Sequence, residues 1–171
     1  MRLYLLRHGK AVEREAFAPG DDASRPLTNV GRERTRLVAE GMQRLGLTFD
    51  LILSSPLTRA RQTAEIVAGA FDAAGSLRFT ERLAEEASLA DLVREIRALQ
   101  PEPESLLLVG HEPNLGELTS LLLGAESPLP IRFKKAGLCC LSVAGIETGP
   151  CAVLEWLLAP SQLRLLANLT R

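Results

Sequence analysis

Three short stretches of the chain share one pattern, in which a run of apolar residues ends abruptly in polar ones. The runs are Leu3–Leu6, Leu51–Leu53, which belongs to a strand predicted over Phe49–Leu53, and Leu106–Val109. Each has the length of a buried strand and is too short for a buried helix. Stretches with helical spacing of apolar residues lie between them. Strands that alternate with helices in this way predict a parallel sheet.

Amphipathic segments fill the intervals between these runs. Thr28 is predicted to cap a helix whose apolar stripe continues to Leu45 before Gly46 ends it. Gly41 lies in that stripe, where we expect it to permit a close approach to the sheet. The next helix is predicted to begin at Ser55-Pro56, with the serine as N-cap and the proline at the first helical position. Further helices are predicted at about 89–99, 113–123 and 161–169.

The remaining chain predicts weaker elements. Short strands are expected at 77–80, 131–133, 138–143 and 153–158, with a hairpin turn at 145–150 between the last two. The polar segment from Glu13 to Arg25 has no periodicity and is predicted to be a loop. Because this loop leaves directly from the histidine, we expect it either to border the site, where it could act as a flap, or to be a plain surface loop.

Composition limits the classes of function that fit. The chain has 171 residues, of which 46% are hydrophobic, enough for one domain over residues 1–171 with a genuine core. A net charge of −1 argues against a nucleic-acid-binding surface. No apolar run reaches the length of a signal peptide core or a membrane span, so we expect a cytoplasmic protein without a membrane partner. Its three cysteines suggest neither a disulfide framework nor a zinc site.

The chain contains two histidines, and both follow apolar runs and adjoin glycines: His8 precedes Gly9, and His111 follows Gly110. A lone histidine is more often an ordinary packed or surface residue, but two in matching positions favour one shared site. Parallel sheets bind ligands beyond the carboxyl ends of their strands. Gly9 is expected to allow a sharp turn through a positive φ directly after His8.

The expected ligand of this site is an anion. Arg7 precedes the first histidine, and Arg59 falls in the first turn of a predicted helix, where the helix dipole disfavours a cation unless an anion is bound nearby. Thr63 shares the face of Arg59, four residues away. Arg61 points elsewhere on the same helix and is expected to be exposed to solvent.

Four motifs together resemble the histidine phosphatase superfamily, also called phosphoglycerate mutase-like. They are Leu-Arg-His-Gly at 6–9, Leu-Thr-x-x-Gly at 27–31, Ser-Pro-x-x-Arg-Ala-x-Gln-Thr-Ala at 55–64 and Gly-His-Glu-Pro at 110–113. The short chain, with Arg-His-Gly-Lys-Ala at 7–11 and Lys-Lys-Ala-Gly at 134–137, is most similar to the compact SixA-type phosphohistidine phosphatases. Phosphoglycerate mutases continue Arg-His-Gly with Glu or Gln, whereas Lys10 and Ala11 follow here, which argues against mutase activity.

The resemblance implies a fold and a set of roles. The fold is a three-layer α/β/α arrangement with a mostly parallel central sheet. His8 would be the nucleophile that becomes phosphohistidine, and Arg7, Arg59 and His111 would surround the phosphoryl oxygens. No cofactor is implied, and two histidines without clustered carboxylates make a poor metal site, so we expect a metal-independent enzyme. The family's usual general acid has no clear counterpart; the candidates are Glu81 and Glu85.

These features predict a phosphatase that acts on phosphohistidine in a small signalling or phosphotransfer protein. The alternative within enzymes is a phosphomonoesterase for small phosphate esters. A hypothesis from another class is a non-catalytic module that binds phosphorylated ligands through the same pocket, although such a module has no need of a nucleophile. The expected partner is therefore a phosphorylated protein or a small phosphate ester.

Overall fold

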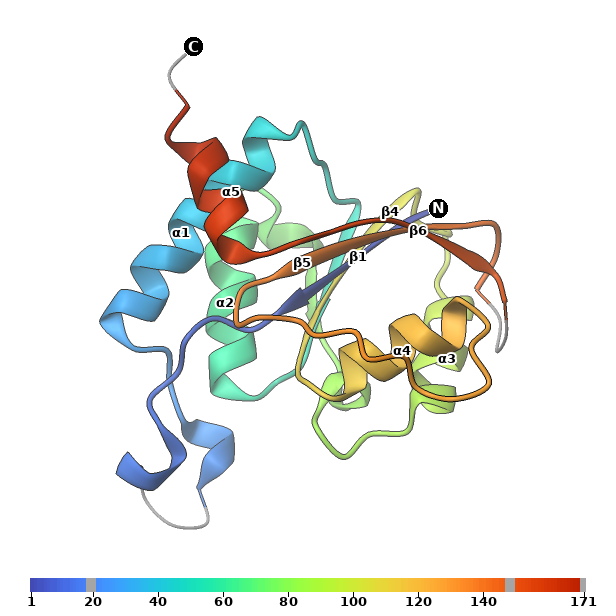
Figure 1. The fold of residues 1–171 in the computed structure, drawn as a ribbon, viewed down its shortest axis with the longest axis horizontal. Coiled ribbons are helices and arrows are strands. Elements are labelled where there is room, and N and C mark those ends of the chain that lie inside the picture. Colours follow the sequence, from blue (N-terminus) through green and yellow to red (C-terminus); the bar gives the residue numbers. More distant parts are fainter. Residues whose placement is uncertain (18–20, 147–149, 170–171) are drawn as a thin grey trace.

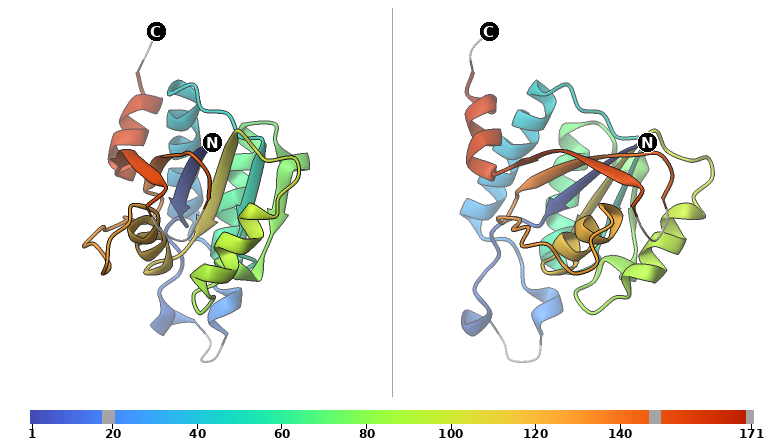
Figure 2. Two further views of the ribbon diagram at one scale, coloured as in Figure 1. Left: turned by 90° about the vertical axis from the view of Figure 1, so that its right-hand side faces the viewer. Right: turned by 45° about the vertical axis from the view of Figure 1, so that its right-hand side comes forward.

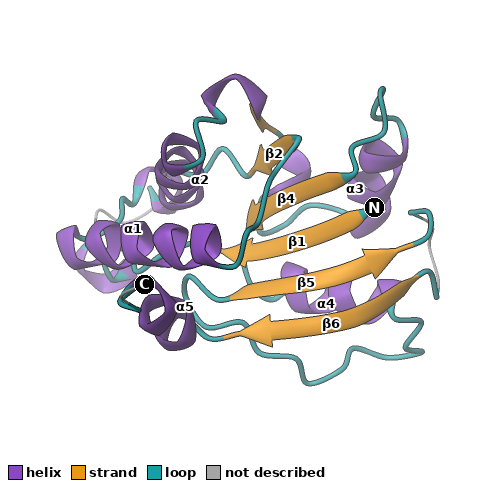
Figure 3. Cartoon of the chain, turned by 90° about the horizontal axis from the view of Figure 1, so that it is seen from above, coloured by secondary structure: helices purple, strands orange, loops and turns teal. Residues whose placement is uncertain are grey.

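The computed structural model describes residues 1–17, 21–146 and 150–169 of the chain. Its described residues form one mixed sheet of six strands, in the order β3-β2-β4-β1-β5-β6. Figures 1 and 3 show the strands side by side with helices packed around them. The strands are β1 (Arg2–Arg7), β2 (Leu51–Ser54), β3 (Leu77–Phe79), β4 (Ser105–Gly110), β5 (Leu138–Val143) and β6 (Ala152–Leu158). The helices are α1 (Asn29–Arg44), α2 (Thr58–Ala70), α3 (Leu89–Arg97), α4 (Asn114–Leu122) and α5 (Pro160–Ala167).

The first four strands along the chain are parallel, and the last two are not. β4 pairs in parallel with both β1 and β2, and β3 extends the sheet beyond β2 as a parallel edge strand. β5 runs antiparallel to β1, and β6 antiparallel to β5. Figure 2 shows the blue β1 between the yellow β4 and the orange β5. The mostly parallel sheet and the order of strands and helices agree with the prediction.

Two hydrophobic cores cover the two faces of the sheet and make the three layers. One face packs against α1, α2 and α5, whose buried residues include Met42, Val67 and Leu163. The other packs against α3 and α4. Adjacent cysteines in β5 divide between the two cores, because neighbouring residues of a strand face opposite sides: Cys139 belongs to the α3–α4 side and Cys140 to the α1–α2 side.

Two local predictions are wrong. The second helix begins at Thr58 with Leu57 as N-cap, so Ser55 does not cap it and Pro56 does not occupy the first helical position. Ser55 instead accepts a hydrogen bond from the N–H of Leu57 at 3.3 Å. Residues 131–133 form no strand; Phe133 is fully buried in an irregular segment. The strand was predicted only because this segment contains apolar residues. An apolar side chain that is buried in an irregular segment, as Phe133 is, gives the same pattern.

Gly9 and Gly41 allow close packing between segments, but in ways that differ from the prediction. Gly9 does not adopt the positive φ predicted for it; a Cβ there would lie 2.5 Å from the hydroxyl oxygen of Thr35. Gly41 faces α5 rather than the sheet, since a Cβ at this position would lie 2.0 Å from the carbonyl oxygen of Leu163. Gly46 ends α1 with φ of +70°, as predicted.

The predicted loop from Glu13 to Arg25 contains two short 3-10 turns, at Arg14–Ala16 and Asp22–Ser24. Its residues 18–20 lie outside the described residues, as do residues 147–149 of the hairpin turn predicted at 145–150. Among the described helices, none has the length and hydropathy needed to cross a bilayer.

Candidate active site

The two histidines meet because their strands are parallel neighbours in register. Arg7 at the end of β1 pairs with Gly110 at the end of β4, so His8 and His111 emerge together from the same sheet edge. The N–H of His8 donates to the carbonyl of Gly110 at 3.0 Å. The two ring centroids are 5.1 Å apart, with the ring planes tilted by 52°. The two histidines therefore lie together at the carboxyl ends of the strands, where the sequence analysis expects a shared site.

His8 presents a neutral ring with one nitrogen free. Its side chain is 5% exposed, and its Nδ1 lies 2.7 Å from the carbonyl oxygen of Gly9. Because a carbonyl only accepts, Nδ1 carries the proton and Nε2 the lone pair. Burial, followed by the proximity of His111, lowers the pKa of His8 to about 2, and the charges of Arg59 and Arg7 act in the same direction. At neutral pH the ring is therefore an unprotonated potential nucleophile.

His111 is held by Ser55, the residue directly after β2. The Nε2 of His111 lies 2.8 Å from the Ser55 hydroxyl, which also accepts from the N–H of Leu57. The hydroxyl is thus left to donate to Nε2, which assigns the ring proton to Nδ1. Burial and then the charge of Arg59 lower the pKa of His111 to about 4, against the opposing charge of Glu85. The ring is a neutral donor.

Arg59 lies in the first turn of α2, and its side chain is fully buried. Its Nη1 donates to the carbonyl of Asp22 at 2.8 Å; its Nη2 lies 2.9 Å from the Asp22 carboxylate and pairs with Glu85. Thr63 links α2 to the segment that follows His8. Its hydroxyl donates to the carbonyl of Arg59 at 2.7 Å and accepts from the N–H of Gly9 at 3.0 Å.

Arg7 is positioned by a short chain of hydrogen bonds. Its Nη1 donates to the carbonyl of Phe133 at 2.7 Å, and the N–H of Phe133 donates to the Glu112 carboxylate at 2.7 Å. Burial lowers the pKa of Arg7, while the charges of Glu112 and Glu85 oppose that shift. The segment predicted to be a strand thus orients a guanidinium at the site instead of joining the sheet.

Three buried side-chain nitrogens lack a hydrogen-bond partner among the described residues, and all three belong to this group: Arg7 Nε, Arg59 Nε and His111 Nδ1. The last lies 3.4 Å from Glu85, within ion-pair distance but without hydrogen-bond geometry. A buried donor without an acceptor costs roughly 1–3 kcal/mol. Three such donors around one histidine fit a ligand that supplies several oxygen acceptors.

The two predicted acidic candidates occupy different surroundings. Glu85 contacts Arg59 and His111, and its side chain is 32% exposed. Glu81 is exposed, and within the described part of the chain its side chain makes no hydrogen bond or ion pair. The structure therefore brings Glu85, and not Glu81, to the four other predicted residues.

Asp22 was not predicted at this site. It comes from the loop without periodicity and pairs with Arg14, Arg25 and Arg59. Burial by itself would raise the pKa of Asp22, but hydrogen bonds from Arg25 and Arg14 and the charge of Arg59 lower it to about 2. The loop contains Asp21 and Asp22 in sequence, and nothing in the pattern indicates which of them would reach a distant helix.

Comparison with known proteins identifies relatives over nearly the whole chain. A protein of Picosynechococcus sp. (strain ATCC 27264 / PCC 7002 / PR-6), itself uncharacterized, is 42% identical over 87% of this chain and 86% of its own length. Phosphohistidine phosphatase SixA of Escherichia coli (strain K12) is 26% identical over 96% of this chain and 98% of its own.

A solved structure of the protein histidine phosphatase SixA complexed with tungstate superposes with a TM-score of 0.81. It is 26% identical and covers 95% of this chain and 99% of that one. Residues 3–88 match the model of the histidine phosphatase superfamily (branch 1). With motif, fold and sequence in agreement, the chain belongs to the histidine phosphatase superfamily.

Proposed function

We propose that the protein is a phosphatase that takes the phosphoryl group from phosphohistidine of another protein onto His8 and then transfers it to water. The observation that carries this proposal is the set of unpartnered buried donors around the His8 ring: Arg7 Nε, Arg59 Nε and His111 Nδ1. Phosphoryl oxygens are acceptors of the kind these donors lack. The SixA relatives are phosphohistidine phosphatases by name, which supports the same substrate class.

In the first step the Nε2 lone pair of His8 attacks phosphorus, and the P–N bond of the substrate breaks. The departing imidazole takes a proton from solvent, while the Nδ1 proton of His8 stays hydrogen-bonded to the carbonyl of Gly9. The two arginines carry fixed charges that offset those on the phosphoryl oxygens, and His111 donates from Nδ1. Because the pKa of His8 is lowered to about 2, no proton must leave the ring before attack.

In the second step water attacks phosphorus on the phosphorylated His8. The P–N bond to Nε2 breaks, inorganic phosphate is released with one proton returned to solvent, and neutral His8 is regenerated. Splitting one displacement into two lets each proceed through the same charge-stabilising donors. Neither step requires a metal ion.

The surroundings of Glu85 favour a P–N substrate over a P–O substrate. An alkoxide leaving group needs a positioned acid, whereas imidazole leaves as a weak base with a conjugate-acid pKa of about 6.5. Glu85 pairs with Arg59 and lies 3.7 Å from Arg14. A carboxylate between two cations is arranged as an acceptor, and not as a donor of a proton to a leaving group.

The second candidate function is a phosphomonoesterase for small esters, and the position of Glu85 near His111 is the observation in its favour. The test is kcat/KM for a phosphohistidine protein against a panel of sugar phosphates. We expect a preference for phosphohistidine of orders of magnitude, with Glu85→Gln changing it little. Comparable values, together with a large loss for esters alone in Glu85→Gln, would establish the esterase instead. No turnover with either substrate, but binding of both, would indicate a non-catalytic module.

A further inference from the structure

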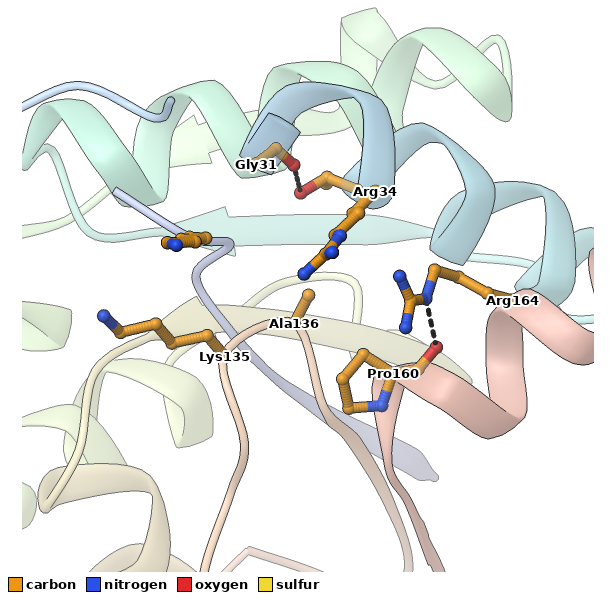
Figure 4. A pocket seen from close by; sticks show the side chains of 8 residues that line it. Gly31, Arg34, Lys135, Ala136, Pro160 and Arg164 are labelled. Carbon is orange, nitrogen blue, oxygen red and sulfur yellow. Dashed lines mark hydrogen bonds between the residues drawn. The ribbon is translucent and has the colours of Figure 1, made fainter. Parts of the chain in front are cut away.

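A second cluster of cations lies beside the candidate active site. A hollow of about 180 Å³ opens between α1, α5 and the turn before β5 (Figure 4). The basic side chains around it are Lys10, Arg34, Lys135 and Arg164. The other lining residues are Gly31, Thr35, Ala136 and Pro160. The cations come from four separate parts of the chain, and the residues that line the hollow include no carboxylate.

These four cations have no acidic partners. In the described ranges 1–17, 21–146 and 150–169, each ion pair involves other residues. Arg164 donates from Nε to the carbonyl of Pro160 at 3.2 Å, which fixes its direction without neutralising it. The whole chain has a net charge of only −1. Positive charge is therefore concentrated locally, and like charges at such proximity favour the binding of an anion.

The hollow shares a wall with the His8 loop. The N–H of Ala136, on the floor of the hollow, lies 3.0 Å from the carbonyls of both Arg7 and His8. Lys10 follows the histidine by two residues, and its carbonyl accepts from the N–H of Thr28 at 3.0 Å. The backbone of residues 7–10 thus carries the candidate nucleophile and one of the cations of the hollow.

We propose that these four cations form a subsite for acidic side chains on the protein that carries the phosphohistidine. This inference rests on the proposed function and adds to it the character of the partner surface. A phosphorylated side chain at His8 presents its phosphoryl group to Arg7 and Arg59, so a second anion must come from another part of the same substrate. Carboxylates of a protein surface supply it, and complementary charge across an interface favours the correct partner.

The probes are two synthetic phosphohistidine peptides of identical length, one with four flanking Glu residues and one with four flanking Gln residues. We expect the Glu peptide to have the lower KM at low salt and to lose this advantage as ionic strength rises. The double variant Arg34→Gln/Lys135→Gln should raise KM for the Glu peptide by about threefold to tenfold, because each exposed ion pair contributes modestly. The value of kcat, and both constants for the Gln peptide, should stay within twofold.

The matched control for the single variant Arg34→Gln is Arg36→Gln, which removes the same charge from the same helix. Arg36 is exposed and lines a different hollow, together with Glu40 and Glu65. This variant should leave the preference for the Glu peptide unchanged. Equal loss in Arg36→Gln and Arg34→Gln would reduce the effect to net charge and overturn the subsite.

Two further arms separate failure of the subsite from failure of the proposed function. Fluorescence anisotropy with the unphosphorylated peptides measures binding without turnover; equal Kd values for the Glu and Gln forms would overturn the subsite whatever the enzyme hydrolyses. Turnover of O-phosphoserine and 3-phosphoglycerate tests a small anionic substrate. If Arg34→Gln/Lys135→Gln reduces their kcat/KM as much as that of the Glu peptide, the cations serve a small carboxylate and the protein partner is ruled out.

Discussion

The protein has two groups of cations, and they differ in how they are held. Arg59 is fully buried and bonded to Asp22 and Glu85, and Arg7 is bonded to the carbonyl of Phe133. Around the neighbouring hollow, Lys10 and Arg34 are exposed and make no ion pair within the described chain. Arg59 and Arg7 therefore have their geometry fixed before a ligand arrives, whereas Lys10 and Arg34 are not held by ion pairs.

The two groups of cations are therefore suited to different tasks. Stabilising charge that develops in a transition state requires donors that are already oriented and desolvated. Attraction of a partner requires only unbalanced charge at the surface, where each pair contributes little and salt weakens it. We therefore expect substitutions in the first group to change catalysis by orders of magnitude, and those in the second to change KM by several-fold.

The largest expected effect comes from Arg59. Arg59→Ala should lower kcat/KM by about 10²–10³-fold, the usual cost of removing one preorganised donor. Arg61→Ala is the matched control, because Arg61 lies on the same helix with a side chain 49% exposed and only a 3.8 Å contact with Glu65. The kcat/KM of Arg61→Ala should stay within twofold of the wild-type value. Both values of kcat/KM are measured by steady-state kinetics on folded protein. A larger loss in Arg61→Ala than in Arg59→Ala would show that the phosphoryl group binds the other face of α2.

The second effect concerns stability and pH. Burial lowers the folded-state pKa of His8 to about 2 and, with the charge of Arg59, that of His111 to about 4, against an ordinary value of 6.5. The unfolded chain binds more protons, so stability is fully present above pH 6.5 and is lost as pH falls below it. When the pH is lowered from 7.5 to 5.0, each histidine should reduce the free energy of unfolding by about 2 kcal/mol.

Urea unfolding at the two pH values measures this loss. His8→Asn should remove about half of the histidine contribution to the pH dependence, and His8→Asn/His111→Asn nearly all of it. If the double variant loses as much unfolding free energy between the two pH values as the wild type does, other groups cause the pH dependence. The two rings would then not be buried as neutral species.

A smaller effect is expected where α1 meets α5. Gly41→Ala places a methyl group 2.0 Å from the carbonyl oxygen of Leu163 and should destabilise the fold by about 1–3 kcal/mol. Gly69→Ala, in a helix position with no atom within 4 Å, should instead stabilise it by about 0.5–1 kcal/mol. Because α5 carries Arg164, Gly41→Ala should also weaken the preference for acidic peptides more than it lowers kcat. Equal thermal shifts in the two variants would contradict this packing.

The smallest expected effect is that of metal removal, which should be none. Among the described residues, no three His, Cys, Asp or Glu side chains gather as ligands of one ion. Dialysis against EDTA followed by assay should leave kcat/KM unchanged. A loss that a single divalent ion restores would show that phosphoryl charge is balanced by a metal in addition to the arginines.

Much of the fold followed from the sequence because its signals are local. The runs that became β1, β2 and β4 are short, apolar and ended by polar residues, and their parallel pairing brings His8 and His111 to one edge. The position of Arg59 in the first turn of its helix could also be predicted, because helical spacing places Arg59 and Thr63 on the same face. Periodicity and strand-end chemistry suffice for such residues.

The residues that sequence missed act through contacts between distant segments. Asp22 reaches Arg59 from a loop without periodicity, and Phe133 links Glu112 to Arg7 through its backbone. The close contact of Gly41 with Leu163 likewise depends on how two helices that are far apart in sequence pack, and no local pattern encodes it. Spacing identified Glu81 and Glu85 equally, and only the fold separates them.

Trapping the phosphorylated enzyme tests directly whether His8 accepts the phosphoryl group. A brief reaction with ³²P-labelled phosphohistidine protein, quenched in base, should give one labelled site that is stable to alkali and labile to acid, with the label on the peptide containing His8. Free Nε2 and a pKa lowered to about 2 make this ring the expected acceptor. His8→Ala should not be labelled, while Arg61→Ala should label as wild type does. A label that persists in His8→Ala, or that maps to His111, would show that His8 does not accept the phosphoryl group.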